Sequence, residues 1–223
     1  MKFVTAVRSF LHLTAIALLF AAVATPALRA ADEGFTPMFN GRDLTGWELR
    51  EYQQPAPDQW SFKDGVLVAK NGQGWLATKQ EYENFVLRLE WRIPTNGNSG
   101  VFLRVPPLKE KEQPWTAGVE IQVLDDTGPT YVGKIKPSQF SGSIYGVVAP
   151  TKAKYRGTEQ WNHFEITCRG GRMSVGFNGE EVAAADMDAT PALRARARKG
   201  VIGLQNHGSG VEFRNVQIKV LQP

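Results

Sequence analysis

The sequence is poor in the residues that most often build reactive centres. It holds one cysteine, Cys168, and three histidines among 223 residues. A single cysteine excludes an intrachain disulfide, so the fold must depend on its hydrophobic core. Cys168 ends an alternating run, 163–168, which favours a buried structural thiol over a catalytic one. The histidines show no HxH or HxxxH spacing and therefore give no signature of a metal site.

Motifs that mark common enzyme classes are also missing. The sequence has no GxSxG nucleophile elbow, no Walker phosphate loop and no dinucleotide fingerprint. It also has no internal repeat and no low-complexity segment. These gaps argue against α/β-hydrolases, P-loop nucleotidases, dinucleotide-dependent dehydrogenases and solenoids.

The chain lacks an apolar run long enough to be a clear membrane span. Phe10 to Ala24 is shorter than the ~20 residues that a spanning helix needs, and Pro26 breaks its end. Lys2 and Arg8 precede the run, and small residues crowd 21–31. This order is typical of a cleaved secretory signal over residues 1–30 rather than an anchor. We therefore expect an exported protein of the bacterial periplasm or cell envelope, with no membrane span in its mature form.

An excess of positive charge is absent once the expected signal is set aside. The whole chain holds 26 Lys and Arg against 22 Asp and Glu. Residues 1–30 carry Lys2, Arg8 and Arg29 and no acid, so the basic count falls from 26 to 23 and the net charge to +1. This balance argues against a nucleic-acid partner. The basic run 194–199 alternates with alanine, which is typical of a solvated face.

The sequence is rich in period-two alternation. Phe85 to Ile93 places its apolar side chains on one face and Arg88, Glu90 and Arg92 on the other. The same pattern recurs in further segments: 101–105, 119–124, 161–168, 173–177, 201–205 and 211–221. Many short strands predict an all-β antiparallel sandwich or jelly roll in one domain.

The connections between these segments are those of hairpins. Gly170-Gly171 and Asn178-Gly179 are two-residue turns that accept positive φ, so residues 161–182 predict a three-stranded meander. The helix signal is weak, because only Pro191 to Lys199 suggests one or two helical turns. The longest irregular stretches, 106–115 and 127–143, are the segments in which we expect a functional site.

Polar residues of complementary chemistry gather around the segment 119–124. Glu120 and Gln122 share one face of the predicted strand, Trp115 precedes it and Asp125 follows it. Sugar sites have this composition, because aromatic rings stack on sugar rings while carboxylates and amides meet hydroxyls. The alternative interpretation is an ordinary solvated face.

A second pair with the same spacing is Gln205 and His207, which leads into a glycine-rich turn. His207 has a structural role in a turn as its alternative, and His163 is interpreted as structural. The turn 96–100, which contains Asn98, is either a plain hairpin connection or a loop that approaches a ligand.

Several segments, taken in order, resemble the 3-keto-disaccharide hydrolase domain family. The resemblance spans residues 34–222, which we expect to form one domain. It rests on these segments: 39–47, 90–92, 98–102, 118–125, 161–163, 178–179, 203–208 and 213–216. It implies a concanavalin A-like jelly roll of two antiparallel sheets with a concave sugar-facing surface. It also implies cleavage of disaccharides or glycosides whose glucose carries a ketone at C3.

One departure from the family pattern affects the site. This chain reads Ile144-Tyr145-Gly146 where relatives tend to read Leu-Tyr-Asp. Any acidic role at position 146 is therefore lost.

A ketone at C3 acidifies the C2 proton, so the glycosidic bond can break by elimination. Such a site needs a base, an acid and donors for the enolate oxygen. We expect Glu120 and His207 to be the two proton carriers. The residues expected to bind the substrate are Gln122, Gln205, Arg104, Glu90, Asp125, Tyr145, Trp115 and Asn98.

Two rival interpretations stay open at this point. Within the enzymes, Glu120 paired with Glu90 or Asp125 could hydrolyse the bond directly. Outside them, the same fold serves carbohydrate-binding modules that have no catalysis. No cofactor is predicted, although a divalent ion held by Glu120, Asp125 and His207 is compatible with the sequence. The expected partner is a small carbohydrate.

Overall fold

A computed structural model describes residues 34–50 and 59–222 of the chain, so the expected signal over residues 1–30 lies outside the described residues. Regular structure in the described part consists of strands and two single helical turns, α1 (Pro114–Ala117) and η1 (Pro137–Gln139). The strands are β1 (Thr36–Pro37), β2 (Trp47–Arg50), β3 (Trp60–Lys63), β4 (Val66–Ala69), β5 (Gly74–Tyr82), β6 (Phe85–Arg92), β7 (Asn98–Val105), β8 (Val119–Leu124), β9 (Asn162–Arg169), β10 (Arg172–Phe177), β11 (Glu180–Asp186), β12 (Gly200–Asn206) and β13 (Glu212–Val220).

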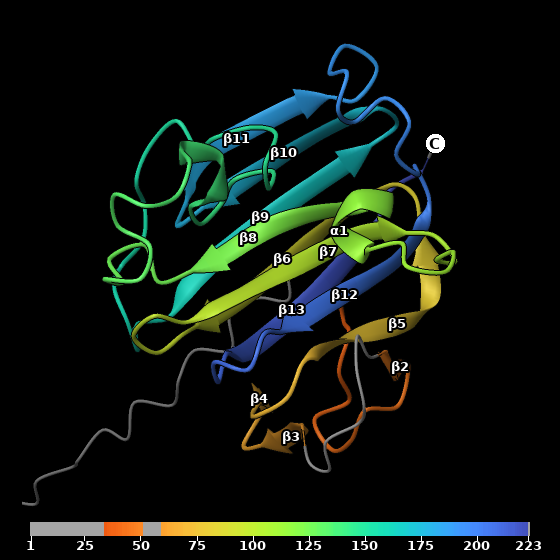
Figure 1. Cartoon of the computed structure of the whole chain (residues 1–223). Helices are drawn as coiled ribbons and strands as arrows, with labels where there is room; N and C mark the ends of the chain where they lie inside the picture. Colours follow the sequence, from red (N-terminus) through yellow and green to blue (C-terminus); the bar gives the residue numbers. More distant parts are fainter. Residues whose placement is uncertain (1–33, 51–58, 223) are drawn as a thin grey trace, which may run out of the picture. The chain divides into compact units, whose positions relative to one another are not determined.

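The strands form two antiparallel sheets that pack face to face (Figure 1). The eight-stranded sheet has the order β11-β10-β9-β6-β13-β4-β3, with β1 paired to β13. The five-stranded sheet has the order β2-β5-β12-β7-β8. Neighbours in these sheets are far apart in sequence, as in β6 beside β13 and β7 beside β12. The predicted all-β, two-sheet jelly-roll sandwich is confirmed.

The alternation of β6 sets the register of the sandwich. Phe85, Leu87, Leu89 and Trp91 are fully buried between the sheets, while the intervening residues are partly exposed on the outer side. The five-stranded sheet contributes Val101 and other apolar residues to the same core. Because a shift of one residue would move every apolar side chain into water, the burial of these faces fixes the register. The predicted orientation of this segment is confirmed.

The predicted meander of residues 161–182 is also confirmed. β9, β10 and β11 follow one another in antiparallel order. Gly170 joins the first pair with φ +54°, and Asn178 and Gly179 join the second with φ +49° and +91°. These left-handed angles match the twist of a two-residue hairpin.

The weak helix signal over 191–199 corresponds to turns rather than to a regular helix. The segment forms hydrogen-bonded turns, in which Thr190 accepts bonds from the backbone N–H groups of Leu193 and Arg194. The fully buried Leu193 anchors these turns in the core, so packing overrides the local helix signal. Over residues 34–50 and 59–222, the structure contains no helix long and apolar enough to cross a membrane.

Candidate functional site

The outer face of the five-stranded sheet, here called the pocket face, carries the polar residues predicted for a site. Glu120 lies opposite Phe102 across the β8–β7 pair, and Gln122 lies opposite Gly100. Their neighbour Ile121 points the other way into the core. Side chains directly opposite in a sheet share a face, so strand pairing brings Glu120, Gln122 and the side chains of β7 together.

A buried apolar cluster lies on the same face of the sheet as these polar groups. It contains Trp75, Phe102, Val105 and Val201, and Trp115 packs against it. The rings of Trp75 and Phe102 meet edge to face with centroids 5.5 Å apart. Gln205 lies opposite Trp75 across the β12–β5 pair. The pocket face therefore combines aromatic surface with amides and one carboxyl group.

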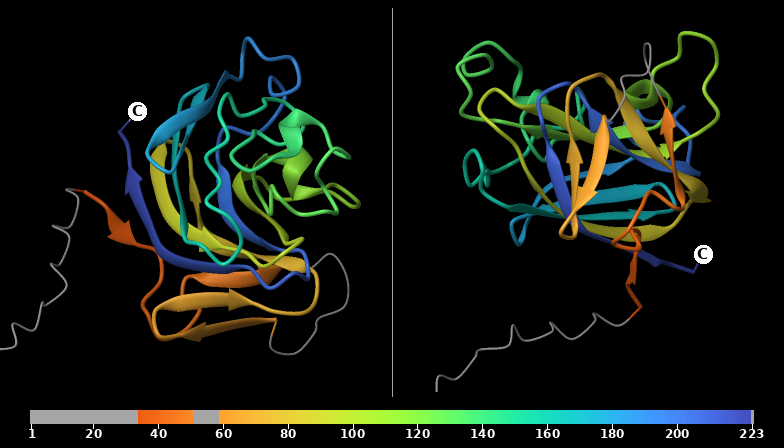
Figure 2. Two further views of the ribbon diagram at one scale, coloured as in Figure 1. Left: turned by 90° about the vertical axis from the view of Figure 1, so that its left-hand side faces the viewer. Right: turned by 90° about the horizontal axis from the view of Figure 1, so that it is seen from below.

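Two loops fold over the pocket face and supply its walls, in the green part of the chain in Figure 2. The α1 turn brings Gln113 and Trp115 to the site. The loop that follows β8 returns along the edge of that strand, where the Tyr145 N–H donates to the Glu120 carbonyl oxygen at 2.9 Å. The Tyr145 hydroxyl is held in turn by Gln139 Nε2 at 3.0 Å. Of the two long loops predicted to carry a site, 106–115 contributes Gln113 and Trp115 to the pocket lining, whereas no described lining residue comes from 127–143.

The turn after β12 places His207 at the rim. Asn206 Oδ1 accepts the N–H of Gly208 at 2.9 Å, which closes the turn. Ser209 Oγ accepts the N–H of Asn98 and donates to the Asn98 carbonyl oxygen, at 2.9 and 2.8 Å. These bonds tie the turn to the start of β7. His207 itself is exposed to solvent at the mouth of the pocket.

Together these elements enclose a cavity of about 260 Å³. Its described lining residues are Gln73, Asn98, Gln113, Trp115, Glu120, Gln122, Tyr145, Gln205, Asn206 and His207. The volume lies just below the range for drug-sized ligands and suits a compact ligand such as a single sugar ring. Seven predicted site residues thus meet in one pocket: Asn98, Trp115, Glu120, Gln122, Tyr145, Gln205 and His207.

Glu120 is the chemically distinctive group of the pocket. Its side chain is 4% exposed, and no described residue hydrogen-bonds its carboxyl group. The carboxyl lies against Gly100 of the neighbouring strand, where an added Cβ would come within 2.2 Å of Glu120 Oε1. The absent side chain at Gly100 therefore creates the recess that holds this carboxyl group.

Burial of this carboxyl group controls its protonation. Desolvation raises the pKa of Glu120 from 4.5 to about 8, opposed by the charge of Arg196. Low-dielectric surroundings disfavour the charged carboxylate unless hydrogen bonds or a close cation compensate. At neutral pH Glu120 is therefore mainly the neutral acid, which can donate a hydrogen bond or a proton.

The amides of the pocket also have capacity for a ligand. Gln205 is 5% exposed, and its Oε1 has no hydrogen-bond partner among the described residues. Gln122 Nε2 reaches Asn98 Oδ1 only at a long 3.4 Å. A buried amide oxygen without a partner costs free energy, so a ligand hydroxyl that supplies the missing hydrogen bond would be bound favourably.

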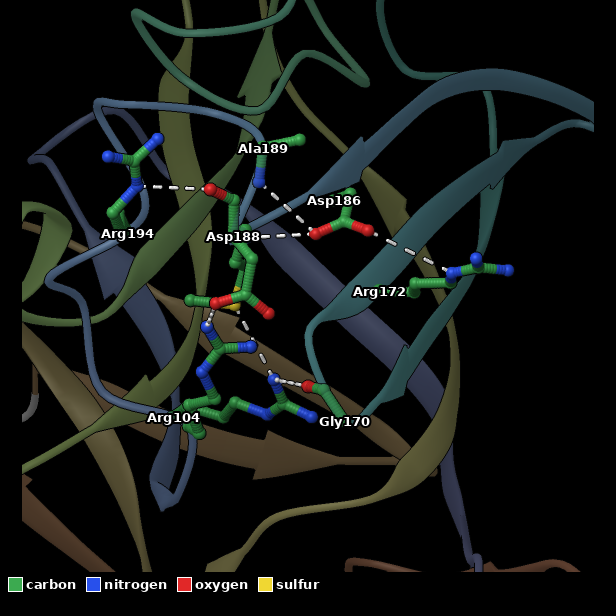
Figure 3. A network of polar contacts seen from close by, with 9 residues as sticks. Arg104, Gly170, Arg172, Asp186, Asp188, Ala189 and Arg194 are labelled. Carbon is green, nitrogen blue, oxygen red and sulfur yellow. Dashed lines mark hydrogen bonds and ion pairs between the residues drawn. The ribbon is translucent and has the colours of Figure 1, made fainter.

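Arg104, predicted to bind the substrate, lies outside the pocket. A β-bulge offsets β7 against β12, and Arg104 itself adopts φ +53°. The bulge turns the side chain away from the pocket face and buries it completely. Its guanidinium donates to the backbone oxygens of Glu83 and Gly170, the latter at 2.9 Å (Figure 3). Arg104 therefore fastens β7 to the connection between β5 and β6, which links the two sheets, and to the β9–β10 turn of the eight-stranded sheet.

Glu90 and Asp125 are also outside the pocket. Glu90 lies on the outer face of the eight-stranded sheet, where Arg214 Nε donates to its carboxylate at 2.6 Å. The Asp125 carboxylate accepts the N–H groups of Asn96 and Thr127 and so caps the turn after β8. Neither predicted residue is brought to the pocket, and the carboxylate of each is already hydrogen-bonded where it lies. The described residues contain no cluster of three or more His, Cys, Asp or Glu able to hold a metal ion, and Asp125 is not brought to Glu120 and His207.

The structure adds residues that the sequence did not indicate. Gln73, Gln113 and Asn206 line the pocket, and Gly100 forms its recess. Strand pairing could have revealed Gly100, since it stands opposite Gln122. Gln73 and Gln113 lie outside the strands, where the alternation of residues does not predict which way a side chain points.

Comparisons with known proteins bear on this site. The 3-keto-disaccharide hydrolase of Bacteroides thetaiotaomicron is 27% identical in an alignment 232 positions long, which spans 85% of this chain and 79% of the relative. A solved structure from Parabacteroides distasonis, named "putative glycosyl hydrolase", is 26% identical with a TM-score of 0.75, over 85% of this chain and 95% of that one. The Bacillus licheniformis β-glucanase shares the fold alone, at 13% identity and a TM-score of 0.53, over 84% of this chain and 97% of that one. The family described as the 3-keto-alpha-glucoside-1,2-lyase-like domain matches residues 34–219, and the chain belongs to this family of carbohydrate-active proteins.

Proposed function

We propose that the chain is an enzyme that cleaves disaccharides or glycosides whose glucose carries a ketone at C3. The observation that carries this proposal is the Glu120 carboxyl group, which is buried in a sugar-sized pocket without a hydrogen-bond partner among the described residues. A pKa of about 8 keeps it protonated at neutral pH. The chain belongs to the family described as the 3-keto-alpha-glucoside-1,2-lyase-like domain, and this membership supports a 3-keto glucoside as the substrate.

The chemistry proceeds by elimination across C1 and C2 of the keto sugar. His207 takes the C2 proton, which the neighbouring ketone acidifies, and the electron pair of that C–H bond forms the C1=C2 double bond. The C1–O bond breaks as Glu120 gives its proton to the leaving oxygen. The products are a free sugar and an unsaturated keto sugar, to which water can add to complete a net hydrolysis.

The other groups of the pocket orient the ring. Trp115 offers an aromatic wall on which a sugar face can stack. The amides of Gln122 and Gln205 meet hydroxyl groups, and the unpartnered Gln205 Oε1 accepts one of them. Apart from Glu120, His207 and Tyr145, the described lining consists of amides and Trp115, which suits a neutral substrate.

Direct hydrolysis by a pair of carboxylates finds less support in this pocket. Such a pair requires two carboxyl groups within about 5–10 Å that flank the bond. Glu120 is the only carboxyl group among the described lining residues. Glu90 and Asp125 are held by other partners elsewhere.

The decisive experiment incubates the purified protein with 3-ketotrehalose or 3-ketosucrose, with and without EDTA. We expect release of free sugar and a transient ultraviolet absorption from the conjugated keto product. Unmodified trehalose is the control and should not be cleaved, because it lacks the ketone that acidifies C2–H. Binding without cleavage would favour a carbohydrate-binding module, and equal cleavage of trehalose would make the chain an ordinary glycosidase. Loss of activity with EDTA would add a metal ion to the mechanism.

The proposed location of the enzyme is outside the bacterial cytoplasm, with residues 34–222 as the working domain. The support is the sequence of residues 1–30, which has the pattern of a secretory signal. Sequencing the N-terminus of the native protein should give a start between Ala22 and Asp32. A native protein that still begins at Met1 would contradict export by this route.

A further inference from the structure

The basic run that follows β11 does more than face solvent, because one of its arginines reaches the pocket wall. Arg196 Nη1 donates to the carbonyl oxygens of Trp115 and Gly118, at 2.8 and 3.1 Å. The N–H of Ala197 donates to the carbonyl oxygen of Ala117 at 3.3 Å. The loop thus binds three carbonyl groups at the C-terminal end of the α1 turn, where a cation is favourable.

These bonds reach the two elements that shape the pocket. Trp115 lines the pocket, and Gly118 is two residues from Glu120 at the entrance to β8. Gly118 packs tightly on β7, since an added Cβ would come within 2.5 Å of the Leu103 carbonyl oxygen. A change in the position of the α1 turn would therefore alter both the aromatic wall and the start of the strand that carries Glu120.

Arg196 is also the cation that acts on the buried carboxyl group. The other titratable groups that line the pocket with Glu120 are His207 and Tyr145, and the remaining described lining residues are amides and Trp115. Burial raises the pKa of Glu120 to about 8, and the Arg196 guanidinium opposes that rise. The guanidinium is not part of the described lining but is held at the Gly118 carbonyl oxygen, just before the strand that carries Glu120.

We propose that Arg196 is a positioning residue of this pocket: it holds the α1 turn and Trp115 over the pocket face and places a positive charge at the start of the strand that carries Glu120. The chain offers a matched comparison two residues away. Arg194 belongs to the same basic run but is exposed, and its Nε donates to the Asp188 carbonyl oxygen within its own loop. Residue type and sequence context are shared, and only Arg196 contacts the wall.

The test separates the charge from the hydrogen bonds with Arg196→Gln and Arg196→Lys, and Arg194→Gln is the control. Infrared titration follows the protonated carboxyl band of Glu120, identified by its loss in Glu120→Gln. In Arg196→Gln the midpoint should rise by about half a pH unit or more, because a favourable charge is lost. Arg196→Lys keeps the charge and should leave the midpoint near that of the parent. Arg194→Gln should change nothing.

A kinetic measurement with the keto disaccharide tests the other half of the proposal, and it rests on the proposed function. Both Arg196 variants should raise KM several-fold, since glutamine is too short to reach both carbonyl oxygens and lysine replaces the planar Nη1 group that binds them with a tetrahedral ammonium. An unmoved midpoint in a folded Arg196→Gln protein would overturn the proposal, as would an equal rise in Arg196→Lys. If Arg196→Gln fails to fold, the lysine variant decides: a raised KM with a constant midpoint supports the role, and an unchanged KM overturns it.

The infrared arm needs no substrate and therefore stands apart from the proposed reaction. A protein that cleaves no keto sugar but shows the shifted midpoint would keep the assignment of Arg196 and refute the reaction. If the protein cleaves keto sugars but all variants have the same titration midpoint and the same KM, the proposed reaction stands and the assignment of Arg196 is refuted.

Discussion

The outer faces of the two sheets are built from the same residue types and serve different ends. The eight-stranded sheet has a ladder face, on which Arg88 pairs with Glu165, Arg92 with Glu212, and Arg214 with Glu90. Trp161 lies under both Arg92 and Arg214, with guanidinium-to-ring distances of 4.8 and 4.0 Å. The pocket face also has a glutamate and a tryptophan, but its described lining has no arginine.

The difference lies in how the carboxyl groups are satisfied. Glu90 keeps 23% of its side chain in contact with solvent and accepts bonds from Arg214 and Asn215. Glu120 is almost completely buried and has no hydrogen bond from a described residue. A carboxylate that is already paired has little capacity left for chemistry, whereas an unpaired buried acid is ready to donate a proton. The two faces therefore differ in whether their carboxyl groups have partners, rather than in residue type.

The largest expected effect comes from removing the acid on each face in turn. Glu120→Gln keeps the shape of the side chain but cannot give up a proton to the leaving oxygen. The rate of keto-disaccharide cleavage should fall by ~10²–10⁴-fold, the usual contribution of one acid or base. Glu90→Gln should change the rate by less than about twofold, because exposed ion pairs contribute little. Steady-state kinetics on both variants make the comparison.

A binding measurement shows whether the loss of rate in Glu120→Gln comes from lost proton transfer or from a lost binding site. The neutral amide that Glu120→Gln introduces can still hydrogen-bond a sugar, so the affinity for a product sugar should survive, as measured by calorimetry. Full activity in Glu120→Gln would clear this residue of proton transfer. A large rate loss in Glu90→Gln would show that the ladder face, rather than the pocket face, carries the reaction.

The sequence predicted the fold well because alternation is a local property. The strands of 85–93 and 119–124 expose their period of two directly, and burial of one face leaves a single register. The same rule places Glu120, Gln122 and Gln205 on the pocket face, while His207 lies just beyond the end of β12 at the rim of the pocket. Periodicity therefore located most of the pocket before any tertiary structure was known.

The sequence misplaced residues where a bulge interrupts the alternation of a strand, or where a partner far away in the sequence determines what a side chain contacts. Arg104 has the correct spacing on its strand, but a bulge reverses its side chain. Glu90 alternates like Glu120, and only its partner Arg214, 124 residues away in sequence, makes it structural. Arg196 was interpreted as solvated because its contacts lie 78 and 81 residues away. The alternation of polar and apolar residues within one segment gives no information about such bulges or long-range contacts.

A smaller effect concerns stability, and its sign differs between the two faces. The folded state raises the pKa of Glu120 from 4.5 to about 8, so the folded protein holds this proton more tightly than the unfolded chain does. The stability that this group contributes is complete below about pH 4.5 and is lost as the pH rises through about 8. Glu120→Gln cannot ionise and escapes this loss. Its free energy of unfolding should exceed that of the parent by a few kcal/mol at alkaline pH.

Urea unfolding at a series of pH values from 5 to 9 provides the measurement. The advantage of Glu120→Gln should grow with pH up to about 8 and then level off. Glu90→Gln is the control, and it should be slightly less stable than the parent by about 0–1 kcal/mol across this range. An advantage that does not vary with pH would mean that Glu120 is not held as a neutral acid. In that case the buried Glu120 would not differ in protonation from the ion-paired Glu90 on the other sheet.

The smallest effect tests whether the recess at Gly100 positions the acid. Gly100 has an ordinary extended backbone in β7, so alanine strains it only through the 2.2 Å approach of the new Cβ to Glu120 Oε1. The carboxyl group must move toward the mouth of the pocket, where it is better hydrated and ionises at lower pH. We expect activity at neutral pH to fall about tenfold and its alkaline limit to move to lower pH. Gly176→Ala on β10 is the matched control, because its Cβ would meet only the Glu165 carbonyl oxygen and Cβ, at 3.3 and 3.5 Å. An unchanged pH limit in Gly100→Ala would mean that the carboxyl group reaches its buried position without this recess.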